Sequence, residues 1–341
     1  MLLTPANLNI FFTATDQRYN QAYQQAESWA QMISTAYPNS TEQWLQGWLG
    51  QFDKLREWIG PRTVHVPAPS TYIATVKIFE YTIGIDKFKL QFDQYGIYSD
   101  FATRIGYRAR KWPDYNLRDL IEASGDYTAA ALQLGTDGVN HWSAVHPVDV
   151  WDAGKGTYVN DYGAAGTSIN GITVGGTFST NAWATMYTDH SSRRDESGEK
   201  MSILADQTMV PLQLHWEAKT VIQQGFFSPA QIGTLGGGLA PTAGVATPAN
   251  TAMVGALDNP FKGSTDLMMN PDLASVAAFY LLTTKGPVKP FGFVQNQAPV
   301  IIPRSSPTDP AMFDNRTMLW GVEAVGVAVW APPFLSSRSG I

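Results

Sequence analysis

Histidines and carboxylates in the middle of the chain are the residues whose types could support metal or acid–base chemistry. His141, His146 and Asp149 could ligate a metal, but the histidines are five residues apart, unlike the i, i+4 pair of a helical zinc site, and the chain has no cysteine. Asp195 and Glu196 lie in the charged run RRDESGEK, which is typical of a solvated hairpin tip. We therefore predict no metal ligand, no cofactor site and no catalytic residue.

Motifs for phosphate binding and for nucleophilic catalysis are also lacking. The glycines at 236–238 are not followed by the Lys-Ser/Thr pair of a phosphate loop, and no G-x-S-x-G elbow occurs. Lys77 lies near a predicted strand end, where a lysine is usually a solvated edge charge. These observations predict a protein that is not an enzyme.

A stripe of cations at helical spacing is the one concentrated charge feature, because charged residues make up only 15% of the chain. On a helix starting near residue 99, Phe101, Ile105 and Trp112 fall on one face. The adjoining stripe consists of Arg104, Arg108, Lys111 and Arg118. This stripe predicts either non-specific contacts to DNA phosphates or salt bridges to a neighbouring subunit, and the spacing leaves both open.

The segments around this helix indicate what must position it. Residues 64–92 are rich in β-branched and aromatic residues, with period-two alternation at Thr71, Ile73 and Thr75 and again from Tyr81. They predict a hairpin of two long strands over residues 61–92. Because a two-stranded ribbon has too little apolar surface to be stable alone, it must lie on its own domain or on another chain.

An N-terminal segment shows a helical pattern over residues 16–37, ended by Pro38, and forms a candidate arm. Aromatic residues of this kind commonly anchor protein interfaces. We predict contacts to a neighbouring subunit from the arm and the ribbon together, through Tyr19, Tyr23, Trp29, Val66, Tyr72, Val76, Lys77 and Phe79.

The remaining elements are a mixture of helices and strands, which predicts an α+β fold. Pro113 lacks an N–H and should kink or restart the helix that begins at residue 99, and its continuation should end at Gly125. Further helices are expected at 179–190, 211–225 and 272–282, and strands at 290–295 and 318–330. The last of these is almost entirely apolar or small, as in a buried central strand.

The composition favours a subunit that is covered by partners. The 341 residues include 12% aromatics, and so few charges would make an isolated monomer poorly soluble. The absence of cysteine fits a reducing compartment, and the net charge of −6 argues against a dedicated nucleic-acid-binding protein. No apolar run is long enough for a membrane span, and the first residues lack the features of a signal peptide.

Short motifs in a fixed order carry a family resemblance. W-L-G at 48–50, R-E-W-I-G at 56–60, F-E-x-T-I at 79–83 and D-x-x-G-x-Y at 93–98 follow one another, and P-D-x-x-L at 113–117 comes next. The order continues with H-P at 146–147, V-P-x-x-L at 210–214 and N-P-aromatic-x-G at 259–263. This pattern is similar to that of the major head (capsid) protein family of Mu-like tailed phages.

The resemblance implies the Hong Kong 97-like fold. The segments expected from it are an N-terminal arm with an aromatic connector (1–60), an extended loop hairpin (61–92), a peripheral domain with a long spine helix (93–130), a mainly axial domain (131–290) and return strands (291–341). Some capsids of this fold join subunits by a Lys–Asn isopeptide bond, but Lys77 is more simply a solvated charge.

The function implied is that of a tailed-phage major capsid protein, whose homo-hexamers and homo-pentamers form an icosahedral shell around double-stranded DNA. The expected partners are other copies, a scaffold protein, the portal, decoration proteins and the packaged DNA, with no membrane. The shell is assembled in the host bacterial cytoplasm and resides in the virion. The alternatives are an encapsulin-like compartment shell and, in a different class, a monomeric Trp-rich carbohydrate-binding or hydrolytic protein.

Overall fold

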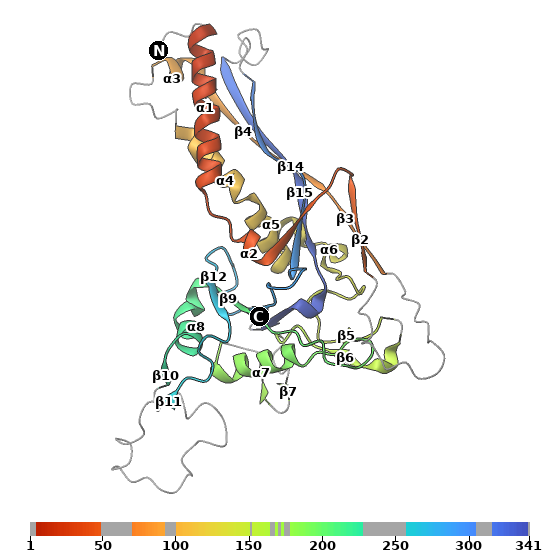
Figure 1. Cartoon of the computed structure of the whole chain (residues 1–341). Coiled ribbons are helices and arrows are strands. Elements are labelled where there is room, and N and C mark those ends of the chain that lie inside the picture. Colours follow the sequence, from red (N-terminus) through yellow and green to blue (C-terminus); the bar gives the residue numbers. More distant parts are fainter. Residues whose placement is uncertain are drawn as a thin grey trace, which may run out of the picture. The chain divides into compact units, whose positions relative to one another are not determined.

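The computed structural model describes residues 5–48, 70–92, 100–150, 152–163, 168–169, 172–173, 178–227, 257–304 and 316–339 (Figure 1). The chain divides into two compact units. Unit 1 comprises residues 1–45, 73–119 and 292–329, and unit 2 comprises 46–72, 120–291 and 330–341. Each unit is therefore assembled from segments that are far apart in the sequence.

The sheet of unit 1 has four strands in the order β1 (Ser34–Pro38), β14 (Phe291–Arg304), β15 (Thr317–Trp330) and β4 (Lys77–Asp86). β15 and β4 run antiparallel, from the pair Thr317 and Asp86 to the pair Gly326 and Lys77. β15 lies between two other strands and is buried at alternate positions along its first half and continuously at its end. The predicted buried central strand at 318–330 is confirmed.

The main helices of unit 1 are α1 (Pro5–Gln25), α4 (Phe101–Arg110) and α5 (Trp112–Ile121), with short helices α2 (Ala30–Ile33) and α3 (Lys87–Gln91). Figure 1 shows α1 beside α4. The helix that begins near residue 99 is interrupted next to Pro113, as predicted, because proline cannot donate the helical N–H. The predicted helix at 16–37 has different bounds, since α1 ends at Gln25 and β1 already begins at Ser34.

Two contacts fix α1 and α2 in unit 1. Gly106 of α4 lies so close to α1 that a Cβ at this position would be 2.4 Å from the Tyr19 carbonyl oxygen. Asp114 at the start of α5 is fully buried and accepts hydrogen bonds from Ser28 Oγ (2.6 Å) and the Ala30 N–H (2.9 Å). The aspartate of the P-D-x-x-L motif therefore ties the spine helix to the chain that follows α1.

The sheet of unit 2 has the order β12 (Asp266–Met269), β9 (Gln207–Val210), β13 (Phe279–Leu282) and β16 (Ser336–Ser339). β12 and β9 are parallel, whereas β13 is antiparallel to both of its neighbours. α7 (Thr180–Ser191) and α8 (His215–Ile222) contribute buried residues to the same core. α7 starts as predicted, with Ser179 Oγ accepting from the Ala182 N–H.

Shorter elements complete unit 2. They are the 3-10 turns η2 (Gly125–Tyr127), η3 (Ala153–Lys155), η4 (Leu212–Leu214) and η5 (Pro333–Leu335), the helix α6 (Ala130–Gln133), and the short strands β5 (His146–Pro147), β6 (Thr157–Tyr158), β7 (Ser168–Ile169), β8 (Ile172–Thr173), β10 (Phe226–Phe227) and β11 (Leu257–Asp258). Within the described part of the chain, no helix has the length and apolar character needed to cross a membrane.

Three predictions about local structure differ from the structure in pairing, type or bounds. The expected hairpin at 61–92 is described only from Ser70 on, and there β3 (Ser70–Thr75) pairs with β2 (Gln43–Trp48), whereas β4 pairs with β15. Residues 61–69 lie outside the described residues. The expected helix at 272–282 contains the strand β13 instead. The expected helix at 211–225 begins as the turn η4 and becomes α-helical only at His215.

Replacing Gly106 with alanine tests the close packing of α1 on α4. Alanine favours a helix over glycine by about 1 kcal/mol, but its methyl group would collide with the backbone of α1. We expect a net loss of about 1–3 kcal/mol in the free energy of unfolding, measured by urea unfolding. Gly47→Ala is the matched control, because a Cβ added at Gly47 would have no other atom within 4 Å. Equal stability of Gly106→Ala and the parent chain would contradict the packing argument.

Candidate functional site

The predicted basic stripe lies on the exposed side of α4 and α5, but its members are in different environments. Arg104 Nε lies 3.2 Å from Asp100 Oδ2, and the Arg104 side chain is 82% exposed. Lys111 Nζ lies 5.3 Å from the centre of the Tyr107 ring. Arg108 is exposed and forms no ion pair with any residue that the structure describes.

Arg118 is the most neutralised member of the stripe. Its Nη2 lies 2.5 Å from Asp119 Oδ1, and its guanidinium lies 5.6 Å from the centre of the Tyr115 ring. Two of the four predicted cations therefore have a carboxylate partner on the same helix segment. These carboxylates make the electrostatic field of the stripe weaker than the sequence suggested.

Aromatic side chains hold the helix segment off the sheet at two places. Near the start of α4, the Phe101 and Trp320 rings are 4.9 Å apart. At the start of α5, the Trp112 ring lies 5.4 Å from Phe79 and 5.0 Å from Phe293. Because both supports are large, α4 spans the interval between them without closing on the strands.

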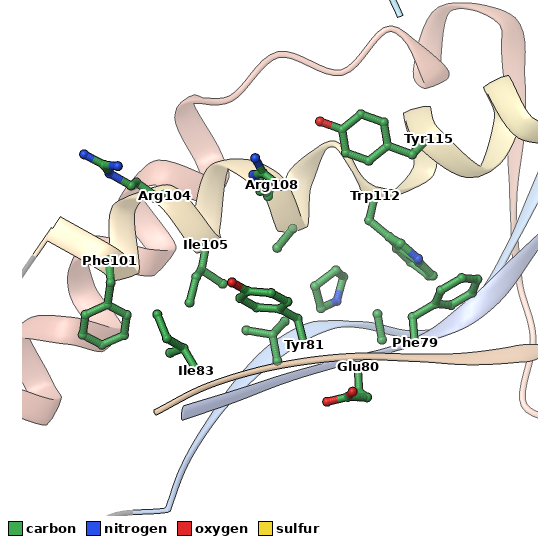
Figure 2. Close-up of a pocket in the computed structure, with 14 residues that line it drawn as sticks. Phe79, Glu80, Tyr81, Ile83, Phe101, Arg104, Ile105, Arg108, Trp112 and Tyr115 are labelled. Atoms are coloured by element: carbon green, nitrogen blue, oxygen red, sulfur yellow. The ribbon is translucent and has the colours of Figure 1, made fainter. Parts of the chain in front are cut away.

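An apolar groove occupies this interval in unit 1. Two of its lining side chains are small, Ala109 on the helix and Ala324 on β15, and its volume is about 500 Å³. Figure 2 shows Phe101, Ile105 and Trp112 directed toward the sheet and Glu80 directed away from the helix. The complete lining is Phe79, Glu80, Tyr81, Ile83, Phe101, Arg104, Ile105, Arg108, Ala109, Trp112, Tyr115, Pro299, Val322 and Ala324.

Two of the predicted intersubunit residues are buried inside their own chain. Tyr19 is 2% exposed, and its hydroxyl donates a hydrogen bond to the Pro299 carbonyl oxygen at 2.9 Å. Tyr72 is 9% exposed, and burial raises its pKa to about 12. These two rings are core residues of their own chain, and for them too a role in contacts between subunits stays a prediction.

The other predicted intersubunit residues are half-buried where the structure describes them. Tyr23 stacks on Tyr19 with Arg110 above its ring, and Phe79 lines the groove. Trp29, Val76 and Lys77 have intermediate exposure, and Val66 lies outside the described residues. A role in contacts between subunits stays a prediction for this set.

The histidines considered as metal ligands are part of a hydrogen-bond network in unit 2. His146 Nδ1 lies 2.6 Å from Asp137 Oδ2. Its Nε2 lies 3.0 Å from the His141 carbonyl oxygen and 3.0 Å from Asn160 Oδ1. Both ring nitrogens of His146 therefore face acceptor oxygens of the protein itself, and neither points to an open position.

The same network fastens β16, the last strand of unit 2. His141 Nε2 lies 3.0 Å from Ser336 Oγ, and His190 Nδ1 lies 2.9 Å from Ser337 Oγ. Arg193 donates from Nη2 to Ser337 Oγ (2.6 Å) and from Nη1 to the Ser336 carbonyl oxygen (3.1 Å). All five side chains are buried, so the network is part of the core.

Burial determines the charge state of these two histidines. Desolvation lowers the pKa of His141 well below its ordinary value, and nearby His146, Arg338 and Arg193 lower it further. Desolvation and Arg193 likewise lower the pKa of His190. Both rings are therefore neutral at pH 7, and the arrangement suits structural support rather than acid–base catalysis.

The first half of the chain is similar in sequence to a known family. Residues 8–172 match the family model of the Mu-like prophage major head subunit gpT. The predicted resemblance is thereby confirmed over this part of the chain.

Two curated relatives extend the comparison. The chain is 30% identical over 160 residues to the major capsid protein of Escherichia phage Mu, covering 47% of this chain and 50% of that protein. It is 26% identical over 146 residues to the Mu-like prophage FluMu major head subunit of Haemophilus influenzae, covering 43% of this chain and 46% of that protein. The aligned stretch thus spans about half the length of these curated relatives.

Similarity of structure covers nearly the whole chain. The procapsid of bacteriophage JBD30 contains a subunit that matches 99% of this chain with a TM-score of 0.53 and 20% sequence identity, over 76% of that chain. At this level of identity the match establishes the fold. The predicted α+β, Hong Kong 97-like fold of phage capsid subunits is confirmed.

Acidification tests the histidine network. The folded-state pKa of His141 and His190 is below the unfolded value of 6.5, so the unfolded chain binds more protons below that pH. Stability present above pH 6.5 should be lost as the pH falls, by up to about 1.4 kcal/mol per pH unit for each histidine. Urea unfolding between pH 7.5 and 5 measures this slope.

The variant His190→Gln lacks one of the two titrating rings, so its free energy of unfolding should depend less steeply on pH than that of the parent chain. Identical pH dependence of the parent and His190→Gln would show that His190 is not the titrating group.

Proposed function

We propose that this chain is the major capsid protein of a tailed bacteriophage, which self-assembles into the icosahedral shell around the double-stranded DNA genome. The single observation that carries the proposal is the agreement of two independent matches. Residues 8–172 match the family model of a Mu-like head subunit, and the fold similarity to a phage procapsid subunit extends over 99% of the chain.

The work of such a subunit is mechanical, and none of its residues acts as a catalyst. The polar side chains that could have supported catalysis, above all His141, His146 and Arg193, are buried and bonded to their own chain. Stability of a shell comes instead from repeated interfaces, each larger than the roughly 1,000 Å² expected of a specific contact.

The partners proposed are those of a capsid subunit. Copies of the chain form hexamers and pentamers, and a scaffold protein, the portal and decoration proteins join them during assembly in the host cytoplasm, before the shell becomes part of the virion. The ribbon of β2 and β3 and the half-buried residues Tyr23, Trp29, Val76, Lys77 and Phe79 are proposed to contact neighbouring copies.

Electron microscopy and size-exclusion chromatography of the purified chain test the shell. We expect closed particles of uniform size that elute far ahead of a single 37.3 kDa chain. A single species at the mass of one chain, without particles under assembly conditions, would contradict the proposal. Particles from the native source that contain an enzyme in place of DNA would favour the encapsulin-like alternative.

We also propose that the basic stripe faces the packaged DNA and adds sequence-independent phosphate contacts. The members suited to test it are Lys111 and Arg118, which lie outside the groove lining. The double variant Lys111→Gln, Arg118→Gln should assemble empty shells at normal yield. Its filled heads should lose DNA on heating at low salt, and the difference from the parent should narrow as salt rises, because salt screens these contacts.

The competing hypothesis is that these cations form salt bridges between subunits. It predicts that the empty shells fail to form stably, before any effect on DNA retention is seen. Empty shells of the double variant would then be unstable, because a partly buried carboxylate would lose its partner. The control variant Lys262→Gln, Lys285→Gln removes the same charge from unit 2. Normal shells and normal DNA retention over the whole salt series would contradict both hypotheses.

A further inference from the structure

The groove of unit 1 is held open by the aromatic contacts at its two ends. The Phe101 and Trp320 rings are 4.9 Å apart at one end, and the Trp112 and Phe79 rings are 5.4 Å apart at the other. These contacts keep the helix segment from closing onto the strands. The volume of about 500 Å³ lies within the range of about 300–1,000 Å³ that small-molecule sites occupy. The groove is therefore preformed and has the size that a small ligand needs.

The length of the groove fits an alkyl tail of medium length. Along the helix axis, the interval from Phe101 to Trp112 corresponds to about 16 Å. An extended chain of single bonds advances about 1.2 Å per bond, so about ten to twelve carbons fit into this interval. The walls there are apolar, because Ile83, Ile105 and Val322 line them. An unbranched alkyl tail would thus be buried against apolar side chains along its length.

Hydrogen-bond donors gather at the Trp112 end of the groove. Arg108, Trp112 and Tyr115 all belong to its lining. Arg108 is exposed and forms no ion pair with a residue that the structure describes. Trp112 Nε1 is shielded from solvent and has no acceptor among the described residues. A buried N–H without an acceptor is costly, so an acceptor supplied by a ligand at this end would be stabilising.

The charges around the groove favour an anion. Arg104 Nε already lies 3.2 Å from Asp100 Oδ2, which leaves Arg108 as the cation of the described lining without a carboxylate partner. Glu80 contributes to the lining, but Figure 2 shows its side chain directed away from the helix. Glu323 lies directly opposite Glu80 on β15 and shares that face of the sheet. An anionic group beside Arg108 would therefore meet a cation without facing either glutamate.

We propose that this groove binds an amphiphilic anion with one unbranched alkyl tail, of the size of decanoate. The carboxylate accepts hydrogen bonds from Arg108 and from the Trp112 N–H, and the tail extends along the groove toward Phe101. The ligand enters as a monomer from solution, because a groove of about 500 Å³ does not accommodate the two long tails of a membrane lipid. The site lies within unit 1 and does not depend on the proposed shell function.

Isothermal titration calorimetry with sodium decanoate tests the site on the purified full-length chain, below the concentration at which decanoate forms micelles. We expect saturable binding of one decanoate per chain. Each CH₂ added between octanoate and decanoate should tighten binding roughly fourfold, because it buries further apolar surface. Decanoate should also raise the midpoint of thermal unfolding, since it binds the folded state.

Three variants test the placement of the ligand. Arg108→Gln should weaken binding roughly tenfold, because the charge-assisted hydrogen bond to the carboxylate is lost. Lys111→Gln removes the same charge from a nearby position outside the groove lining, so it should bind decanoate like the parent chain. Ala109→Leu fills part of the groove and should abolish the gain in affinity from octanoate to decanoate. Circular dichroism checks that each variant is folded.

Quenching of tryptophan fluorescence locates the carboxylate. The probe is 2-bromodecanoate at saturating concentration, which carries a heavy atom next to its carboxylate and quenches indoles in contact with it. Trp112→Phe should remove most of the quenching. Trp216→Phe is the matched control, because Trp216 is 70% exposed on α8 in unit 2, and this variant should be quenched like the parent chain.

Two further ligands test the charge and the source of the anion. Decyltrimethylammonium has the same tail with a positive head group and should bind at least tenfold more weakly than decanoate, because it meets Arg108 instead of a carboxylate. Vesicles of phosphatidylglycerol present an anionic head group on a lipid with two tails. The chain should not co-sediment with these vesicles.

Four outcomes would overturn the proposal. They are no saturable binding of decanoate, equal binding of decyltrimethylammonium, equal quenching of Trp112→Phe and the parent chain, and co-sedimentation with the vesicles, which would assign the groove to membrane lipid. Self-association that Ala109→Leu abolishes, in a chain that does not bind decanoate, would show that a second copy occupies the groove. Shell formation is scored separately by electron microscopy, so failure of this site and failure of the shell proposal are distinguishable.

Discussion

The close packing of the Trp112 indole against Gly326 is the contact on which the arrangement of unit 1 depends. A Cβ at Gly326 would lie 2.8 Å from Trp112 Cη2 and 2.5 Å from the Val294 carbonyl oxygen, so only glycine lets the indole reach the sheet. This contact fixes the start of α5, and the Phe101 and Trp320 rings fix the start of α4. The separation between helix and strands, and with it the groove, follows from these two points.

The sequence predicted those elements whose signals are local. Pro113 interrupts the spine helix, Ser179 caps α7, and the apolar run at 318–330 is a buried strand, because each depends on the chemistry of a few neighbouring residues. The helix predicted at 272–282 was wrong because its apolar run includes Phe279 to Leu282, which are buried on both faces of a sheet. A short apolar run of that kind does not distinguish strand from helix.

The remaining differences between prediction and structure arise where a residue's partner is distant in the sequence. The hairpin prediction paired two adjacent strands with each other, but β3 pairs with β2 and β4 pairs with β15. No local sequence pattern encodes which strand is the partner. The charge stripe was located correctly, yet Asp100 and Asp119 neutralise part of it. In unit 2, the serines of β16 look like an exposed polar tail in the sequence. They are buried because Arg193, His141 and His190 lie in reach of them only after folding.

The discontinuity of both units has a consequence for biosynthesis. The sheet of unit 1 lacks its central strand until β15 (Thr317–Trp330) has been made, and the sheet of unit 2 lacks an edge until β16 (Ser336–Ser339) follows. A nascent chain that already carries α1, α4 and α5 therefore has no completed core on which to pack them. Neither sheet is therefore complete until the ribosome has passed residue 339.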